Sequence, residues 1–292
     1  MQKAVDTGVR NRRQGQLGQV MHRLRKNKVA MVGLIVLLLL ILMAILSPYI
    51  TPYNYAKTSK ADRYALPSWQ HLFGCDAMGR DILSRIMYGS RASLWLGLMS
   101  TLVSTVIGVL LGSLVGYYGG KVDNIVMRIL DIIQAIPGML LSIAISAALG
   151  SGIGNTILAL SIGGIPMTVR LLRGSILTVR KQEYIEAAEK INCSKWRVIT
   201  SHILPNSIAP VIVSVTMGIG NSILQAASLS YIGLGVQPPT PEWGAMLSEG
   251  KSMLTKYPHL CIFPGLAIMI VVLCLNMLGD GLRDAMDPKL KN

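Results

Sequence analysis

Long runs without a single charged residue alternate with shorter, charged segments along this chain. The runs cover residues 29–50, 92–120, 132–169, 203–232 and 260–279. An apolar run of about 20 residues can span a bilayer as an α-helix, so each run predicts at least one transmembrane helix. The run 132–169 is nearly twice that length, and its Gly150-Ser-Gly-Ile-Gly154 segment predicts a tight turn between two spans. The pattern therefore predicts an all-α integral membrane protein with six transmembrane helices, the third and fourth kinked by Pro137 and Pro166.

The same pattern divides the chain into a basic tail, a first helix, a loop, a membrane core and a second tail. These parts are residues 1–28, 29–50, 51–91, 92–281 and 282–292. We call 51–91, which is polar and rich in turn residues, the outer loop. A second Pro- and Gly-rich loop, 233–258, precedes the last span. No small-x-small cleavage site follows the first run, so we expect a retained helix and not a removed signal peptide.

Basic residues predict the orientation of the chain in the membrane. Lys and Arg number 28 against 14 acidic residues, and 20 of the 28 fall in the two tails and in segments 121–131 and 170–202. Because cytoplasmic segments carry the excess of Lys and Arg, we expect both termini in the cytoplasm and the outer loop outside. The net charge of +14 then reflects contact with a lipid bilayer. No nucleic-acid motif accompanies it, so we expect no nucleic-acid partner.

Residues 183–205, called the knob below, lie between the fourth and fifth spans and are charged and helix-forming. Tyr184, Ala187, Ala188 and Ile191 recur at helical spacing, which predicts one apolar face, with Glu183, Glu186, Glu189 and Lys190 on the other. Asn192 is a suitable left-handed stop for this helix, and Ser194 can cap a second one that carries Trp196, Ile199 and Ile203. Two interpretations fit this pattern: a solvated amphipathic loop or a protruding docking element.

The sequence lacks the motifs of common catalytic sites. It contains no GxxxxGK[ST], HExxH or GxSxG segment, and Cys75, Cys193, Cys261 and Cys274 have no metal-binding spacing, so we expect unpaired, structural thiols. No Asp, Glu, Lys or Arg lies in the middle of a predicted span, where ion-coupled transporters normally need one. We therefore expect no enzyme, and no cofactor or metal bound by this chain. An uncharged bundle with a charged knob instead indicates a pore driven by another chain.

The knob resembles the cytoplasmic EAA loop of permease subunits of ATP-binding cassette (ABC) importers. Glu186-Ala187-Ala188, position 192 and Leu204-Pro205 match that family's pattern, E-A-A, three residues, Gly, nine residues, Ile, one residue, Leu-Pro. The chain departs from it at Asn192, in place of Gly, and at His202, in place of Ile. The resemblance implies that loop 171–205 couples the chain to a cytoplasmic ATPase. The coupling residues it implies are Glu183, Tyr184, Glu186, Ala187, Ala188, Ile191, Asn192, Leu204 and Pro205.

The outer loop resembles the signature of C-type permeases of dipeptide, oligopeptide and nickel importers. The matching residues are His71, Gly74, Asp76, Gly79, Arg80, Asp81, Ser84 and Arg85. Further matches are 116–120 with Asp123, Met127-Arg128 and Asp131, then 233–247, 279–284 and Asp287-Pro288. This ordered set covers nearly the whole chain after residue 29. It implies the type I importer (MetI-like) permease fold.

Several signature residues have a simple physical interpretation. Gly74 and Gly79 permit tight turns, and Asp76, Arg80 and Asp81 can form a charge-assisted network. This network either stabilises the outer loop or contacts a binding protein or the substrate. His71 and Asp76 lack a third metal ligand in the sequence, which disfavours a metal site.

Other polar and aromatic residues favour anchoring and packing roles. Arg170 and Arg173 favour anchors that reach toward the membrane surface over ligands of a substrate. Trp69, Trp95 and Trp243 fit either interfacial anchoring or loop packing.

The resemblance implies a permease subunit of an ATP-driven importer of di- or oligopeptides. Its partners would be a homologous second permease, one or two cytoplasmic ATPases that carry ATP and Mg²⁺, and an extracytoplasmic substrate-binding protein. Import of nickel or a metal chelate is the alternative within the family. A stand-alone secondary transporter and a structural scaffold are alternatives from other classes, and the absence of intramembrane charges disfavours the transporter.

Overall fold

The computed structural model describes residues 16–286, and every regular element within that range is helical. The α-helices are α1 (Gln16–Lys26), α2 (Lys28–Ile50), α3 (Ile82–Tyr118), α4 (Gly120–Ala135), α5 (Gly138–Leu149), α6 (Ile153–Val179), α7 (Glu183–Lys190), α8 (Lys195–Arg197), α9 (Leu204–Ser207), α10 (Ala209–Tyr231), α11 (Trp243–Gly250) and α12 (His259–Met286). A π-helix, Val198–Ile203, joins α8 to α9, and a 3₁₀ turn, Lys251–Met253, follows α11. The expected basic tail overlaps α1, and residues 1–15 and 287–292 lie outside the described range.

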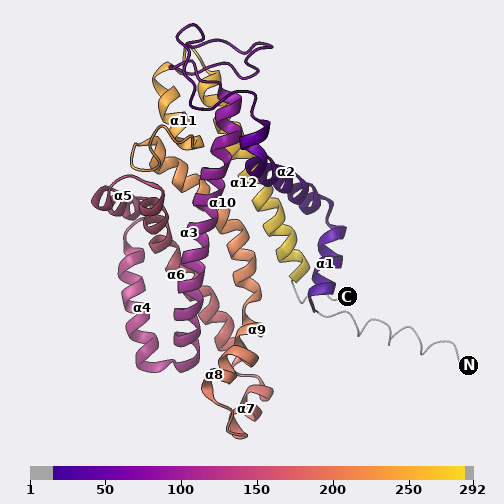
Figure 1. The fold of residues 1–292 in the computed structure, drawn as a ribbon. Coiled ribbons are helices and arrows are strands. Elements are labelled where there is room, and N and C mark those ends of the chain that lie inside the picture. Colours follow the sequence, from indigo (N-terminus) through magenta and orange to yellow (C-terminus); the bar gives the residue numbers. More distant parts are fainter. Residues whose placement is uncertain (1–15, 287–292) are drawn as a thin grey trace, which may run out of the picture.

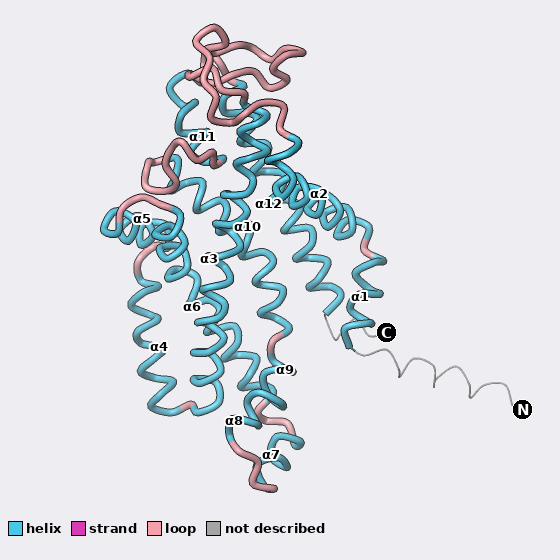
Figure 2. The backbone as a smooth tube through the Cα atoms, in the orientation of Figure 1, coloured by secondary structure: helices cyan, strands magenta, loops and turns pink. Residues whose placement is uncertain are grey.

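Within residues 16–286, five helices are long and apolar enough to cross a membrane: α2, α3, α6, α10 and α12. The pair α4 and α5 makes a sixth span if it is counted as one bent helix. The predicted all-α membrane fold is therefore confirmed. The long helices run roughly side by side, with the knob at one end of the bundle and the outer loop and α11 at the other (Figure 1). Irregular segments gather mainly at the outer-loop end (Figure 2).

Helices α3 and α6 pack against each other along three glycines of α3. A Cβ on Gly108 would lie 2.5 Å from Thr168 Cβ, one on Gly112 would lie 3.2 Å from Leu172 Cβ, and one on Gly116 would lie 2.8 Å from Ile176 Cγ2. The contacts at Gly108 and Gly116 are shorter than side chains tolerate and the one at Gly112 is tight, so glycine is what lets the two helices approach closely. The two helices form the centre of the bundle.

Several helices are longer than the uncharged runs indicated. Helix α3 begins at Ile82, ten residues before the expected start at 92, and the outer loop accordingly ends at residue 81. The polar link 121–131 lies within α4, α12 continues to Met286, and the loop 233–258 contains α11. The physical reason is that a charged residue ends an apolar run without ending a helix, because its side chain can find a partner or solvent.

The third span differs most from the prediction. Residues 132–149 do not form one kinked helix, because α4 ends at Ala135, α5 starts at Gly138, and the two helices meet at 86°. Pro137 provides no backbone N–H and disfavours helical geometry at the residue before it. The break at Gly150–Gly152 lies where it was predicted. Pro166 lies inside α6, which continues past it.

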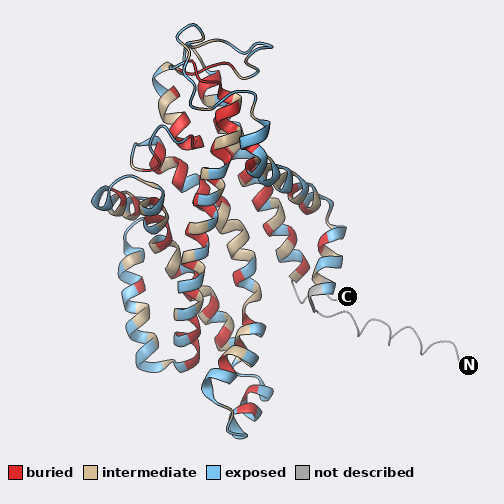
Figure 3. Ribbon diagram, viewed as in Figure 1, coloured by how far each residue is buried: buried red, intermediate tan, exposed pale blue. Residues whose placement is uncertain are grey.

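Burial is concentrated between α3, α10, α11 and α12, and at the base of the knob (Figure 3). Trp243 is completely buried, and its Nε1 donates a hydrogen bond to the Ile86 carbonyl at 3.0 Å, so this tryptophan packs the loop onto α3 and is not an interfacial anchor. Trp69 and Trp95 are exposed.

The outward-facing side chains of α2 are apolar and exposed, as expected of a helix that faces lipid. All four cysteines are unpaired, as predicted.

Candidate functional site

The knob consists of α7, a tight turn, α8 and the π-helix. Asn192 adopts φ of 59°, the left-handed conformation that was predicted for it. The N–H of Asn192 and that of Cys193 donate to the carbonyls of Glu189 and Ala188, at 3.0 and 3.2 Å, which closes the end of α7. Ser194 Oγ accepts from Arg197 N at 3.4 Å and caps α8. Both predicted turn residues are therefore confirmed.

One face of the knob is fixed to the membrane helices. Ile185 and Ala188 of α7, with Val198, Ile199 and Ile203 of the π-helix, are buried in one cluster. The cluster continues into the ends of the long helices through Tyr117, Leu172, Ile176 and Val211. The knob is therefore packed onto the ends of α3, α6 and α10 and does not hang from a mobile loop.

The opposite face of the knob exposes apolar side chains, most of them from the predicted apolar row of α7. Of the predicted apolar row, only Ala188 is buried, whereas Tyr184 and Ile191 are 45% and 77% exposed. Ala187 is exposed too, as are Glu183 and Glu186. The buried row is set by Ile185, one position away from Tyr184, because the membrane helices supply an apolar surface only on that side. Trp196 of α8 is also 71% exposed.

The end of the knob, which contains His202, is π-helical. The six-residue π-helix Val198–Ile203 adds a residue relative to an α-helical turn. Ile203 is fully buried, while His202 is half-buried and its carbonyl accepts from Asn206 Nδ2 at 2.7 Å. Leu204 and Pro205 start α9, where proline is tolerated because the first N–H groups of a helix need no intrahelical partner.

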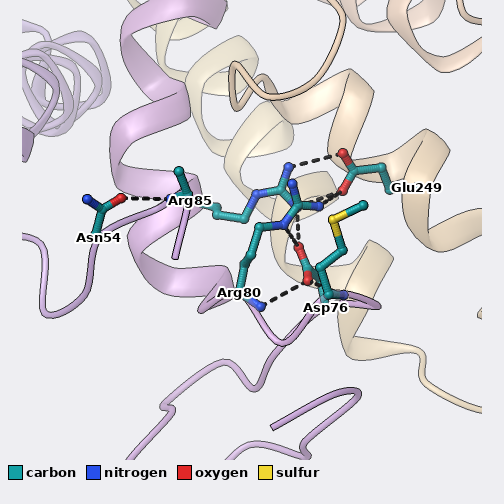
Figure 4. A network of polar contacts seen from close by, with 7 residues as sticks. Asn54, Asp76, Arg80, Arg85 and Glu249 are labelled. Atoms are coloured by element: carbon teal, nitrogen blue, oxygen red, sulfur yellow. Dashed lines mark hydrogen bonds and ion pairs between the residues drawn. The ribbon is translucent and has the colours of Figure 1, made fainter. Parts of the chain in front are cut away.

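At the other end of the bundle, three buried charged residues and the partly buried Glu249 form a cluster, called the ionic clamp (Figure 4). Arg80 Nε and Arg85 Nη1 both donate to Asp76 Oδ2, at 2.6 and 2.5 Å. Both arginines also donate to Glu249 Oε2, at 2.7 and 2.6 Å. The two positive and two negative charges balance, which is what allows Arg85 to be buried. The clamp ties the outer loop and α3 to α11.

Sequence reasoning found only part of the ionic clamp. The predicted contact of Asp76 with Arg80 is present, but Glu249 was not foreseen, since it lies 164 residues beyond Arg85. The available signal was that Glu249 is one of only two acidic residues in the loop 233–258.

Asp81 does not join Asp76 and Arg80, contrary to the expected network. Its Oδ2 accepts from Ser84 N at 2.7 Å and caps α3, and its Oδ1 lies 2.9 Å from His71 Nδ1. Ser84 Oγ accepts from Tyr53 N at 3.1 Å. Gly74 and Gly79 adopt φ of 78° and 72°, and a Cβ on either would collide with a carbonyl of the outer loop, so both predicted turns are confirmed. The signature residues therefore fold the outer loop onto the start of α3.

Among the described residues, one group could hold a metal ion: His71, Cys75 and Asp81, whose ligand atoms lie within 4.8 Å of one another. Asp76, the other candidate from the sequence, is held by the two arginines instead. Burial raises the pKa of the Cys75 thiol to about 12, which keeps it protonated. Both Asp81 oxygens already accept hydrogen bonds. These occupied atoms favour a structural role for the three residues.

Glu242, directly before α11, is a further buried carboxylate, to which the sequence analysis assigned no role. It caps α11 by accepting from Gly244 N and Ala245 N at 2.9 and 2.8 Å, and it accepts from Ser93 Oγ of α3 at 3.2 Å. Burial raises the pKa of this carboxyl, and the hydrogen bonds from the two backbone N–H groups oppose the rise. The charge is offset by N–H and O–H donors.

Arg170 and Arg173, for which the sequence favoured anchoring toward the membrane surface, each pair with an acidic residue of α4. Arg173 Nε and Nη2 donate to the two oxygens of Asp123, at 2.6 and 2.5 Å, and Arg170 Nη2 donates to Asp131 at 2.5 Å. The two pairs join α6 to α4. They bring together residues that the sequence separates by 50 and 39 positions.

The sequence matches two protein-family models and is similar to transport permeases. Residues 108–292 match the family described as binding-protein-dependent transport system inner membrane component, and residues 15–67 match the N-terminal TM domain of oligopeptide transport permease C. The chain is 46% identical over 274 residues to the dipeptide transport system permease protein DppC of Alkalihalophilus pseudofirmus, covering 94% of this chain and 90% of that protein. It is 48% identical over 270 residues to the glutathione transport system permease protein GsiD of Shigella flexneri, covering 92% and 89%.

Solved structures show the same fold at low sequence identity. The MetNI methionine ABC transporter, in inward-facing conformations, aligns with a TM-score of 0.57 and 17% identity over 70% of this chain and 97% of that chain. An amino acid ABC transporter aligns with a TM-score of 0.54 and 15% identity over 68% and 92%. The predicted MetI-like fold and the predicted family are both confirmed: the chain belongs to the family of inner membrane components of binding-protein-dependent transport systems.

Proposed function

We propose that this chain is the permease subunit of an ATP-driven importer of peptides and forms half of the translocation path. The observation that carries the proposal is the similarity, over nine-tenths of the chain, to permeases named for dipeptide and glutathione transport. Glutathione is itself a small peptide, so the two names agree on the class of cargo. The described residues include no nucleotide-binding motif, so ATP and Mg²⁺ are held by partner subunits.

The knob is the surface that couples the chain to a cytoplasmic ATPase. It is packed at its base and exposes Tyr184, Ile191 and Trp196 at its tip. Exposed aromatic and aliphatic side chains on a rigid support are typical of the anchors of protein–protein interfaces. Glu183 and Glu186, on the exposed side of α7, add charge at the rim of this surface. ATP binding closes the two ATPases, displaces the knobs and turns the permease pair from inward-open to outward-open, and hydrolysis resets the pair.

A second, homologous permease completes the channel. Helix α4 leaves Ile125, Ile129 and Ile132 exposed at helical spacing, a continuous apolar row on the described surface. A partner helix or lipid must cover such a row, and half a channel needs a partner. The binding protein delivers substrate on the side of the outer loop, with the N- and C-termini and the knob in the cytoplasm.

Coupling is tested by placing a bulky cation on the exposed face of α7. The variant Ala187→Arg changes a side chain that faces away from the buried cluster, so it leaves the base of the knob intact. We expect normal membrane insertion, loss of peptide uptake and ATP hydrolysis that no longer depends on the binding protein. Thr178→Arg, an exposed position at the end of α6, is the matched control. Normal uptake by Ala187→Arg overturns the role of the knob.

Cargo is tested separately in a strain that lacks this chain. Uptake of labelled dipeptide, longer peptide, glutathione and Ni²⁺ is measured before and after the chain is restored. We expect restored uptake of one or more of the peptides and unchanged uptake of Ni²⁺. Restoration of Ni²⁺ uptake alone overturns the peptide assignment and leaves the importer assignment standing.

A further inference from the structure

The last residues of α3, in the segment Gly116-Tyr117-Tyr118-Gly119, touch the knob although they lie more than sixty positions before it. Tyr117 is only 6% exposed and belongs to the buried cluster at the base of the knob. Its hydroxyl donates to Glu189 Oε1 of α7 at 3.2 Å. The Arg180 guanidinium, at the end of α6, lies 5.4 Å from the centre of its ring. One side chain of α3 thus contacts both α7 and the end of α6.

Helix α3 cannot slide easily along α6. The close approaches at Gly108, Gly112 and Gly116 interlock the two helices over three successive turns. Because Gly116 immediately precedes Tyr117, the contact with the knob continues this interlocked seam. A displacement of the knob that reaches Tyr117 therefore moves α3 and α6 together.

The chain connections of the knob to its two flanking helices differ. Only residues 180–182 separate α6 from α7. Toward α10, the path runs through the π-helix, the short α9 and Ile208, with Pro205 and Pro210 along it. π-Helical segments and prolines interrupt the regular hydrogen bonds of a helix. Helix α7 is thus joined to α6 by the shorter connection, a turn of three residues.

We propose that Tyr117 is a positioning residue that transmits displacement of the knob to α3 through its hydrogen bond to Glu189. The inference rests on the proposed coupling to an ATPase and adds a second route to the chain connections at each end of the knob. Helix α3 is the longest helix of the described chain, at 37 residues, and it reaches from the knob to the ionic clamp. Movement delivered to Tyr117 therefore reaches both ends of the bundle.

The test is the number of peptides transported per ATP hydrolysed, measured in proteoliposomes that contain the complete transporter and its binding protein. Tyr117→Phe removes the hydroxyl and keeps the packed ring, and Glu189→Ala removes the acceptor from an exposed position. Each should lower the ratio by about fivefold, the factor that corresponds to the loss of one hydrogen bond. The double variant should be no worse than either single variant, because both remove the same interaction.

Tyr118→Phe is the matched control. The Tyr118 hydroxyl makes no hydrogen bond to any residue in the range 16–286, and the Lys195 ammonium, 5.6 Å from the ring centre, would face a phenyl ring equally well. We expect the wild-type ratio for this variant.

An unchanged ratio in Tyr117→Phe, an equal fall in Tyr118→Phe, or effects that multiply in the double variant would each overturn the inference. A wild-type complex that shows no ATP-driven peptide uptake overturns the proposed function itself. The two failures are therefore distinguishable.

Discussion

Arg85 of α3 and Glu249 of α11 face each other through two hydrogen bonds, from Nη1 to Oε2 at 2.6 Å and from Nη2 to Oε1 at 3.1 Å. The Arg85 side chain is 2% exposed and that of Glu249 is 25% exposed. A planar guanidinium that meets a carboxylate through two bonds fixes orientation as well as distance. This pair therefore sets how α11 sits on α3.

Replacement of Arg85 by Gln should destabilise the protein strongly. The change leaves Arg80 as the remaining cation beside Asp76 and Glu249. The loss of one member of a buried ion pair costs about 3–5 kcal/mol. Thermal unfolding in detergent measures the effect. Lys121→Gln, which changes an exposed cation of α4, should change the free energy of unfolding by less than about 0.5 kcal/mol. Coincident melting curves for the two variants would show that the ionic clamp contributes nothing.

Titration of Glu242 should make the stability of the folded protein depend on pH, and the Glu242→Gln variant should lack this contribution. Burial raises the pKa of Glu242 in the folded protein above its value in the unfolded chain. The folded state therefore holds this proton more tightly, so the stability it contributes is fully present below the unfolded pKa and is lost as pH rises through the folded pKa.

The measurement compares melting temperatures of wild type and Glu242→Gln across acidic to neutral pH. The advantage of wild type over the variant should shrink as pH rises, whatever the constant offset that the lost acceptor in Gln causes. A difference that stays flat or grows with pH contradicts the assignment.

Orientation in the membrane can be measured by labelling introduced cysteines with an impermeant maleimide. Trp69→Cys, in the outer loop, occupies a position that is 97% exposed and should react in intact cells. Ile191→Cys, at the tip of the knob and 77% exposed, should react only after permeabilisation. The native Cys75 is fully buried and its thiol has a pKa of about 12, so it should stay silent at neutral pH. Cys193 is replaced by Ser in both variants. The reverse pattern of labelling would invert the proposed topology.

The sequence predicted those features that depend on local patterns. Uncharged runs located the spans because a bilayer selects for apolar length. A left-handed residue at Asn192 and tight turns at Gly74 and Gly79 were foreseen because few residue types tolerate positive φ. Features decided by distant neighbours were missed. Nothing local in α7 shows that Ile185, and not Tyr184, faces the membrane helices, and nothing near Arg85 points to Glu249.

Asn192 gives a direct test of how the knob is shaped. Its φ of 59° is accessible to Gly and Asn but costs other residues about 1–2 kcal/mol, and a β-branched side chain suffers most. We therefore expect Asn192→Gly to match wild type in peptide uptake and in resistance of the knob to limited proteolysis. Asn192→Ala should be weaker in both assays and Asn192→Val weakest. Cys193→Ser, at the next position and half-buried, controls for general sensitivity of the turn. If Val served as well as Gly, the left-handed turn would not be what holds α7 in place.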